Sequence, residues 1–335
     1  MKIKRSLFLF FITLLILTAC NLLSPPQPEH PPLKFAYSAW PGYFPIAIAK
    51  EKGFFLQQGV NVETVILENG NGILADFSAG KFDGILSSLG EIIPISATNP
   101  DLRLVLITAE SAGADAVVAQ PQIKSIADLK GKVIATGLGS FGELFVNRML
   151  EINGLTSDQV TLVNAYGEQV PERLRMGVIQ AGHSWEPYVS QMVRTGARVL
   201  FTSRQTPGLM PDVLTFQGKV LRDRPTEIRA FIQAWFQALE YWQLNPKEGN
   251  AIIGKVLHIP PETISPEGVK FLTLSENTQA FTQGDTTDSL YYTAQLYANF
   301  YIQTGSLTRP PDINKLLDPS FIKNSKVRSH NEVRT

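Results

Sequence analysis

The sequence predicts an α/β protein built from two alternating blocks and a largely helical C-terminal third. Short strand-like segments alternate with helix-like segments from residue 33 to about residue 184, a spacing that is typical of βαβ units and parallel sheets. After residues 213–216 the pattern changes to a long aromatic-rich helix and further helices separated by prolines. The segment between residues 33 and 322 is long enough for one large or two medium-sized domains.

The first block contains β-branched or alternating runs that predict strands, and apolar faces ending at a glycine that predict helices. Its predicted elements are strand 33–37, helix 43–52, strand 60–67, helix 73–78 and strands 82–86, 102–108 and 116–119.

The second block has the same alternation. Its predicted elements are helix 126–129, strand 132–136, helix 142–153, strand 160–164, helix 168–176 and strand 181–184. The C-terminal third opens with an amphipathic helix over residues 225–244. Because ligands bind open α/β sheets at the carboxyl ends of their strands, two facing sheets would form a ligand cleft between them.

The N-terminus has the pattern of an export signal. Three basic residues within the first five precede an apolar run over residues 7–17, which is too short to span a bilayer. The segment from Leu17 to Cys20 resembles the bacterial lipobox, in which the cysteine is lipidated and becomes the new N-terminus. Export would separate the chain from cytoplasmic ATP and NAD. The alternative is an ordinary cleaved signal with an incidental Cys20.

The ends of the chain are expected to lie outside the folded part. We expect a lipoprotein signal peptide over residues 1–20, a Pro-rich tether over 21–32 and a disordered tail over 323–335.

Composition excludes several partner classes. The leader's three basic residues leave 27 basic and 30 acidic residues, so no net positive charge attracts nucleic acid. A single cysteine allows no disulfide within the chain, and the four histidines have no metal-ligand spacing. We therefore expect no metal, no cofactor and no nucleic acid, and a monomer.

Two groups of candidate ligand-binding residues follow strands of the first block. Trp40 and Tyr43 come after strand 33–37 and could stack on a ligand, or pack between the strand and the next helix. Ser87 and Ser88 follow strand 82–86, where small hydroxyls either bind a ligand or cap a helix.

The glycine-rich turn GLGSFG at residues 137–142 matches the dinucleotide-binding pattern, and it lies between a strand and a helix. The next strand ends at Asn164, where that pattern requires an acidic residue, and export argues against NAD. Gly139 and Ser140 nevertheless predict free backbone N–H groups at a helix start, which favour an anionic or polar ligand atom. The alternative is a tight turn that needs glycine for its backbone shape.

Trp185 and Glu186 follow strand 181–184. The Glu186 carboxylate could accept hydrogen bonds from a ligand amine, or it could cap the helix that begins near Pro187. His183, within the strand, is expected to be a structural histidine.

Several segments, in this order, resemble one family. They are WPGYFP at 40–45, AKEKGFF at 49–55, GKFDG at 80–84, GADAVVA at 113–119, SIADLKGK at 125–132, WEPY at 185–188 and MPDVL at 210–214. Together with the lipobox, they resemble the solute-binding lipoproteins of ABC importers in the nitrate/sulfonate/taurine group, which also includes proteins that bind thiamine pyrimidine precursors. The resemblance covers residues 33–317.

The resemblance implies a type II periplasmic-binding fold, with two α/β lobes, a central ligand cleft and hinge closure on the ligand. Lobe one would comprise residues 33–118 and 214–322, and lobe two residues 119–213. Asp115 and Asp212, near the two implied crossovers, are expected at the hinge. Where relatives often carry DAAVT, this chain has QAGHS at 180–184, so its ligand floor is expected to differ.

The resulting prediction is a lipid-anchored receptor that captures a small solute for an ABC permease. The glycine-rich turn favours a sulfonate, whereas Glu186 with Trp40 favours an amine or aminopyrimidine, and a zwitterion would satisfy both. The alternative is an exported enzyme that reuses the fold, such as a pyrimidine-synthesis relative. No Gly-x-Ser-x-Gly motif or carboxylate pair supports a catalytic residue.

Overall fold

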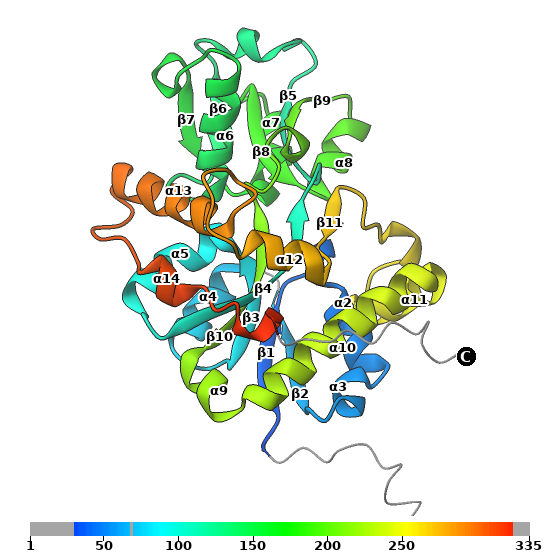
Figure 1. The fold of residues 1–335 in the computed structure, drawn as a ribbon. Helices are drawn as coiled ribbons and strands as arrows, with labels where there is room; N and C mark the ends of the chain where they lie inside the picture. The colour runs from blue at the N-terminus through cyan, green and yellow to red at the C-terminus, as the bar shows by residue number, and fades with distance from the viewer. Residues whose placement is uncertain (1–29, 68–69, 324–335) are drawn as a thin grey trace, which may run out of the picture.

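Two separate β-sheets, each flanked by helices, form the frame of the computed structural model (Figure 1). The structure describes residues 30–67 and 70–323. The predicted signal peptide with Cys20, most of the tether and nearly all of the tail therefore lie outside the described residues.

The first sheet has six strands in the order β11-β4-β10-β3-β1-β2. Strands β2, β1 and β3 are parallel, whereas β10 runs antiparallel to both β3 and β4. The bounds are β1 Leu33–Tyr37, β2 Val62–Ile66, β3 Gly84–Ser88, β4 Leu102–Ser111, β10 Pro211–Gln217 and β11 Val269–Phe271.

The second sheet has five strands in the order β7-β6-β8-β5-β9. Strands β7, β6 and β8 are parallel, and β5 runs antiparallel to β8 and β9. The bounds are β5 Asp115–Ala119, β6 Val133–Thr136, β7 Thr161–Asn164, β8 Ala181–Trp185 and β9 Arg198–Thr202. In each sheet, the strand that follows a crossover lies antiparallel beside the third parallel strand, so the two sheets share one topology.

We call each sheet with its helices a lobe. The first-lobe helices are α2 Pro45–Glu51, α3 Phe54–Gln57, α4 Gly70–Ser78, α5 Leu89–Thr98, α9 Gly218–Asp223, α10 Pro225–Leu244, α11 Pro246–Leu257, α12 Leu274–Ala280, α13 Leu290–Gln303, α14 Ile313–Leu316 and α15 Ser320–Lys323. The second-lobe helices are α6 Phe141–Ile152, α7 Val170–Arg175 and α8 Tyr188–Arg194. Figure 1 shows α12, α13 and β11 beside the junction of the lobes, so the C-terminal third returns to the first lobe.

The first-lobe core is an aromatic cluster beneath α10. The Phe231 ring of α10 lies 4.7 Å from the Phe35 ring, 4.8 Å from the Phe55 ring and 5.6 Å from the Phe216 ring, and all four side chains are buried. Such rings bury large apolar areas, so this face of helix 225–244 is structural.

The two crossovers join β4 to β5 and β9 to β10. The boundary predicted after residue 118 falls inside β5, which pairs along its length with β8. The boundary predicted after residue 213 falls inside β10, which pairs with β3 and β4. We therefore place the crossovers at residues 112–114 and 203–210. Turn residues mark both changes of lobe in the sequence, Gly113 in the first crossover and Pro207 with Gly208 in the second.

The described residues of the predicted tether and tail contact or belong to the first lobe. Arg224 Nη2 donates to the Pro31 carbonyl at 2.8 Å, and His30 Nδ1 lies 2.5 Å from Glu227 Oε1. At the other end, Lys323 closes α15. Within the described residues, no helix is both long and apolar enough to cross a membrane.

Candidate functional site

The first lobe contributes two rings held by one buried carboxylate. Trp40 follows β1 and Tyr43 ends the short helix η1 Pro41–Tyr43, at the carboxyl end of the strand where open α/β sheets bind ligands. Trp40 Nε1 donates to Asp212 Oδ2 at 2.7 Å, and the Tyr43 hydroxyl donates to Asp212 Oδ1 at 2.9 Å. A Cβ on Gly42 would lie 2.6 Å from Trp40 Nε1 and 2.8 Å from Asp212 Oδ2, so only glycine allows this approach.

The environment of Asp212 is unusual for a carboxylate. Burial raises its pKa to about 8, the hydrogen bonds from Trp40 and Tyr43 oppose that shift, and the carboxylates of Asp115 and Glu91 reinforce it. Burial, followed by the charge of Asp212, raises the pKa of Tyr43 as well. Asp212 was expected at the hinge; it lies just after the second crossover, and its side chain accepts from two ring donors.

A small cavity lies beside these rings. Its volume is about 40 Å³, and it is lined by Ser38, Tyr43, Ile73, Leu86, Ser87 and Glu91. Ser87 Oγ donates to Glu91 Oε2 at 2.6 Å, and Ser88 forms a capping box with Glu91 at the start of α5. Ser87 and Tyr43 therefore meet at one cavity, whereas Ser88 caps a helix. The sequence analysis missed Glu91, although the Ser-x-x-Glu spacing at residues 88–91 was a visible signal.

The second lobe contributes a buried histidine–aspartate pair. His183 Nε2 lies 3.0 Å from Asp115 Oδ1, and both side chains are almost fully buried. The Trp185 ring lies 6.0 Å from the His183 ring and 6.4 Å from the Phe141 ring. Asp115 contributes to the pKa shifts of Tyr43 and Asp212, so this pair faces the first-lobe group.

Residues of both lobes also touch directly beside the cavity. A Cβ on Gly90 of α5 would lie 2.6 Å from Phe141 Cβ of α6 and 2.9 Å from Tyr297 Cε1 of α13. Burial raises the pKa of Tyr297 well above its usual value, and the carboxylates of Asp115 and Glu91 contribute. Phe141 and Tyr297 thus close one side of the space between the lobes.

Side chains of the chain itself occupy several amides of the glycine-rich turn. The Gly139 N–H donates to Glu143 Oε2 at 2.6 Å, and the Leu138 N–H donates to Asn164 Oδ1 at 3.0 Å. Ser140 Oγ caps α6 by accepting from the Gly142 N–H, and it donates to the Gly137 carbonyl. The expectation of a free N–H group does not hold for Gly139, because the Glu143 carboxylate occupies its amide, whereas the Ser140 amide has no partner among the described residues and stays a candidate.

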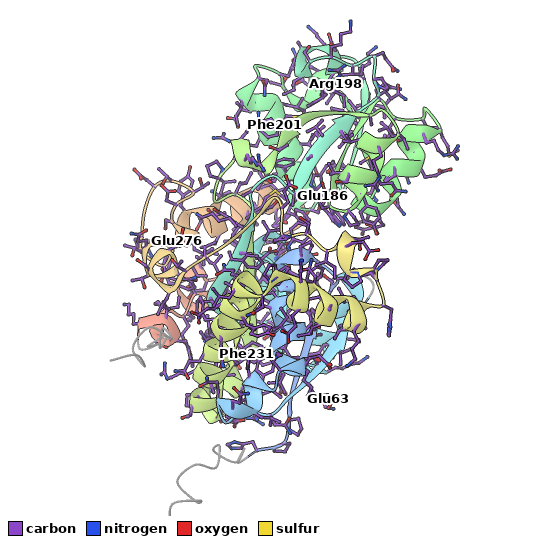
Figure 2. All side chains as sticks on the ribbon, turned by 90° about the vertical axis from the view of Figure 1, so that its right-hand side faces the viewer. Glu63, Glu186, Arg198, Phe201, Phe231 and Glu276 are labelled. Carbon is purple, nitrogen blue, oxygen red and sulfur yellow. The ribbon has the colours of Figure 1, made fainter. Side chains whose placement is uncertain are left out.

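Glu186 lies at the junction of the lobes (Figure 2), but its carboxylate serves a helix. Its Oε2 accepts from the Ser190 N–H at 3.1 Å and its Oε1 accepts from the Ser190 hydroxyl at 3.0 Å. Both oxygens are thus engaged at the first turn of α8, which is the capping alternative rather than the ligand contact.

Hydrogen bonds near Asp115 link the two crossovers. The Asp115 N–H donates to Ser111 Oγ, which lies 2.8 Å from Ser203 Oγ of the other crossover. The Gly113 N–H also donates to Ser203 Oγ, at 2.7 Å. The backbone of Asp115 thus belongs to a hydrogen-bonded link between the crossovers.

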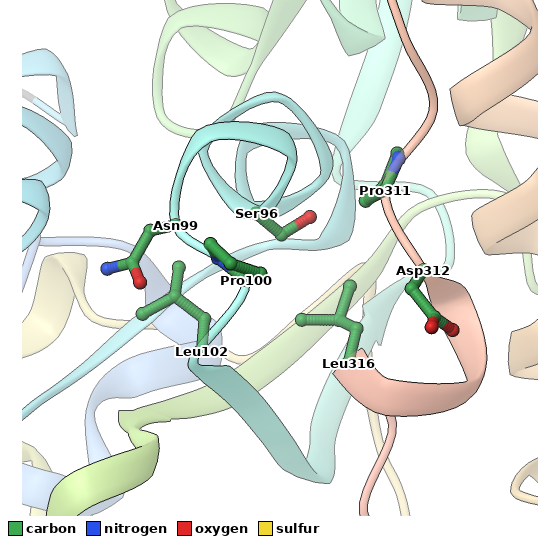
Figure 3. Close-up of a pocket in the computed structure, with 7 residues that line it drawn as sticks. All are labelled: Ser96, Asn99, Pro100, Leu102, Pro311, Asp312 and Leu316. Atoms are coloured by element: carbon green, nitrogen blue, oxygen red, sulfur yellow. The ribbon is translucent and has the colours of Figure 1, made fainter.

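A second hollow lies under α14, on the flank of the first lobe (Figure 3). Its volume is about 10 Å³, room for about one water molecule, and it is lined by Ser96, Asn99, Pro100, Leu102, Pro311, Asp312 and Leu316. None of the candidate residues borders it. Across the described ranges, no group of three His, Cys, Asp or Glu side chains is arranged to hold a metal ion.

Comparison with known proteins gives consistent results. A family model described as "NMT1/THI5 like" matches residues 40–249. A Brucella abortus (strain 2308) protein named as a binding protein is 25% identical over 277 residues, which cover 79% of this chain and 83% of the relative. The periplasmic aliphatic sulphonate binding protein SsuA from Escherichia coli matches with a TM-score of 0.73 at 17% identity, covering 86% of this chain and 92% of that chain.

The periplasmic nitrate-binding protein NrtA from Synechocystis PCC 6803 matches with a TM-score of 0.70 at 16% identity, covering 89% of each chain. These matches confirm the predicted resemblance and the predicted two-lobed periplasmic-binding fold. At such identities the structural likeness carries over the fold and not the ligand.

Proposed function

Because the chain belongs to the NMT1/THI5-like family, we propose that it is a lipid-anchored, extracytoplasmic solute-binding protein. It captures a small polar solute between its lobes and delivers it to an ABC import permease. The observation that carries the proposal is the group formed by Trp40, Tyr43 and Asp212 of one lobe with Asp115 and His183 of the other. Relatives named for binding, and neighbours named for sulphonate and nitrate, support a receptor rather than an enzyme.

Capture and release would use hinge rotation at the two crossovers. Residues 112–114 are held by Ser203 and by Arg204, whose Nε donates to the Ala112 carbonyl at 2.9 Å. This link keeps the two connections together while the lobes move around them, as in hinged binding proteins. The open form would expose Trp40 and Trp185 to a solute, and closure would exclude water from the carboxylates.

Lipidation at Cys20 would hold the protein at the membrane. The contacts of His30 and Pro31 with α10 fix where the chain leaves the first lobe. The segment predicted as a Pro-rich tether would then connect Cys20 to this point.

Native mass spectrometry tests the proposal directly. The protein is purified without denaturant, incubated with the low-molecular-weight fraction of yeast extract, desalted and weighed. We expect the protein to retain a solute and to release it on denaturation with its mass unchanged. Adding that solute should also give a smaller radius of gyration by small-angle scattering. A solute recovered in chemically altered form would favour the enzyme alternative, and no retained solute would contradict a receptor.

A further inference from the structure

Glu91 combines a fixed carboxylate with a place at the cavity. Its Oε2 accepts three hydrogen bonds, from Ser87 Oγ at 2.6 Å, the Ser88 N–H at 3.1 Å and Ser88 Oγ at 3.0 Å. Among the described residues, no hydrogen bond to its Oε1 is formed, and Glu91 lines the cavity beside Tyr43. One oxygen therefore orients the group, and the other is left for a partner.

The charged neighbours of this cavity are acidic and come from three elements. Asp212 of β10, Asp115 of β5 and Glu91 of α5 are close enough for the latter two to shift the pKa of Asp212. After burial, the charges that raise the pKa of Tyr43 are those of the same carboxylates; at Tyr297 Tyr301 contributes first and these carboxylates follow, without a lysine or arginine in either case. Asp115 is bonded to His183 and Asp212 accepts from Trp40 and Tyr43, whereas Glu91 keeps one oxygen without a partner among the described residues. A carboxylate in buried, acidic surroundings is costly, so this arrangement calls for a positive partner.

The second lobe adds an uncommitted polar group. Thr136 Oγ1, at the carboxyl end of β6, is fully buried and finds no hydrogen-bond partner in the described part of the chain. A Cβ on Gly142 would lie 2.9 Å from Thr136 Oγ1 and 2.6 Å from His183 Nδ1, so both atoms face one point. Since His183 is bonded to Asp115, this hydroxyl lies next to the acidic group.

Two of the amides that would hold an oxyanion at the glycine-rich turn are already engaged. The amides of Leu138 and Gly139 donate to Asn164 and to the carboxylate of Glu143. Glu143 thus fills, from within the chain, the position that a sulfonate would take at this turn.

We infer that, within the solute-binding role proposed above, the cleft selects its solute by positive charge: Glu91 receives a protonated amine or amidine group beside Asp212, and oxyanions are rejected. The Trp40 and Tyr43 rings, fixed at their polar edges by Asp212, add the aromatic surface that suits a cation. Charge-assisted hydrogen bonds would favour cationic solutes, and like-charge repulsion would disfavour anionic ones.

The test uses one substitution and a control in the same motif. Glu91→Gln removes the charge and keeps the capping box, because glutamine serves at that position as glutamate does. Glu276→Gln is the control, since Glu276 fills the same position in the capping box of α12, with Thr273. Figure 2 shows Glu276 on the flank of the first lobe.

Benzamidine, benzamide and benzoate have similar shapes and different charges, so together they separate the effect of charge on affinity from that of shape. Calorimetry should give benzamidine an affinity at least about tenfold above that of benzoate, and Glu91→Gln should weaken benzamidine about 10- to 100-fold, with Glu276→Gln unchanged. Benzoate binding as tightly as benzamidine, or benzamidine binding unaffected by Glu91→Gln, would overturn the inference.

The solute retained from yeast extract separates this inference from the proposed function. A retained cation whose affinity falls in Glu91→Gln supports both. A retained anion overturns the selection by charge and leaves the receptor role intact. No retained solute together with no response to any of the three probes overturns the receptor role, and the inference with it.

Discussion

Replacing Asp212 with asparagine should remove a large pH dependence of stability. Burial raises the pKa of Asp212 from 3.8 to about 8. Below about pH 4 the carboxyl is protonated in both the folded and unfolded chain, so its stabilising contribution is fully present. As the pH rises towards 8, the unfolded chain ionises and the folded chain does not, and that contribution is lost.

The size of this effect follows from the shift. Each pH unit between the two pKa values weakens folding by about 1.4 kcal/mol, so the whole interval corresponds to about 6 kcal/mol. Asparagine keeps the geometry, because its Oδ1 accepts from Trp40 Nε1 and its amide can donate to the Tyr43 oxygen, which a hydroxyl permits. The variant should therefore gain stability relative to the natural chain as the pH rises.

Urea unfolding at several values between about pH 5 and pH 8 measures the difference in unfolding free energy between Asp212→Asn and the natural chain. We expect that difference to grow by about 1 kcal/mol or more per pH unit and to level off above about pH 8. Asp285→Asn, at an exposed aspartate, is the control and should follow the natural chain. Parallel profiles for Asp212→Asn and the natural chain would refute the raised pKa and the reasoning from it.

Three further substitutions test other parts of the argument. Glu186→Gln should lower the unfolding free energy by about 0.5–2 kcal/mol and leave solute affinity unchanged, because the carboxylate caps α8; calorimetry showing weaker binding would return Glu186 to the ligand site. Ser203→Ala should cost about 1–3 kcal/mol in urea unfolding, since the half-buried Gly113 amide loses its acceptor; an unchanged midpoint would mean that the crossovers are not linked through this hydroxyl. Cys20→Ala should move the protein from the membrane to the soluble fraction or leave its signal uncleaved, and fractionation with intact-mass analysis showing no change would exclude lipidation at Cys20.

Local sequence patterns predicted an element well where its own residues determine its start, its end and its buried face. Helix 225–244 has the predicted bounds, because Pro225 starts it and one apolar face runs through its length. The short edge strands β9 and β11 were not predicted, since few residues define each one and their pairing partners lie far away in the sequence.

The site was harder to predict because the roles of its side chains depend on hydrogen-bond partners that are far away in the sequence. Trp40 and Asp212 are 172 residues apart, so sequence could place each at a strand end without pairing them. Glu186 and Ser140 were ambiguous for the opposite reason. Their partners are local, and a residue that caps a helix has the same sequence context as one that binds a ligand there.

The acidic cleft is easier to explain by function than by folding. A carboxyl buried as deeply as Asp212 destabilises the folded chain at neutral pH, and nearby Asp115 and Glu91 increase that penalty. A cationic solute would remove it, because the ionised form then has a partner and closure no longer buries unpaired charge. Solute binding, ionisation of Asp212 and lobe closure would then be one coupled equilibrium. The favourable free energy of solute binding would offset the cost of the buried carboxylate.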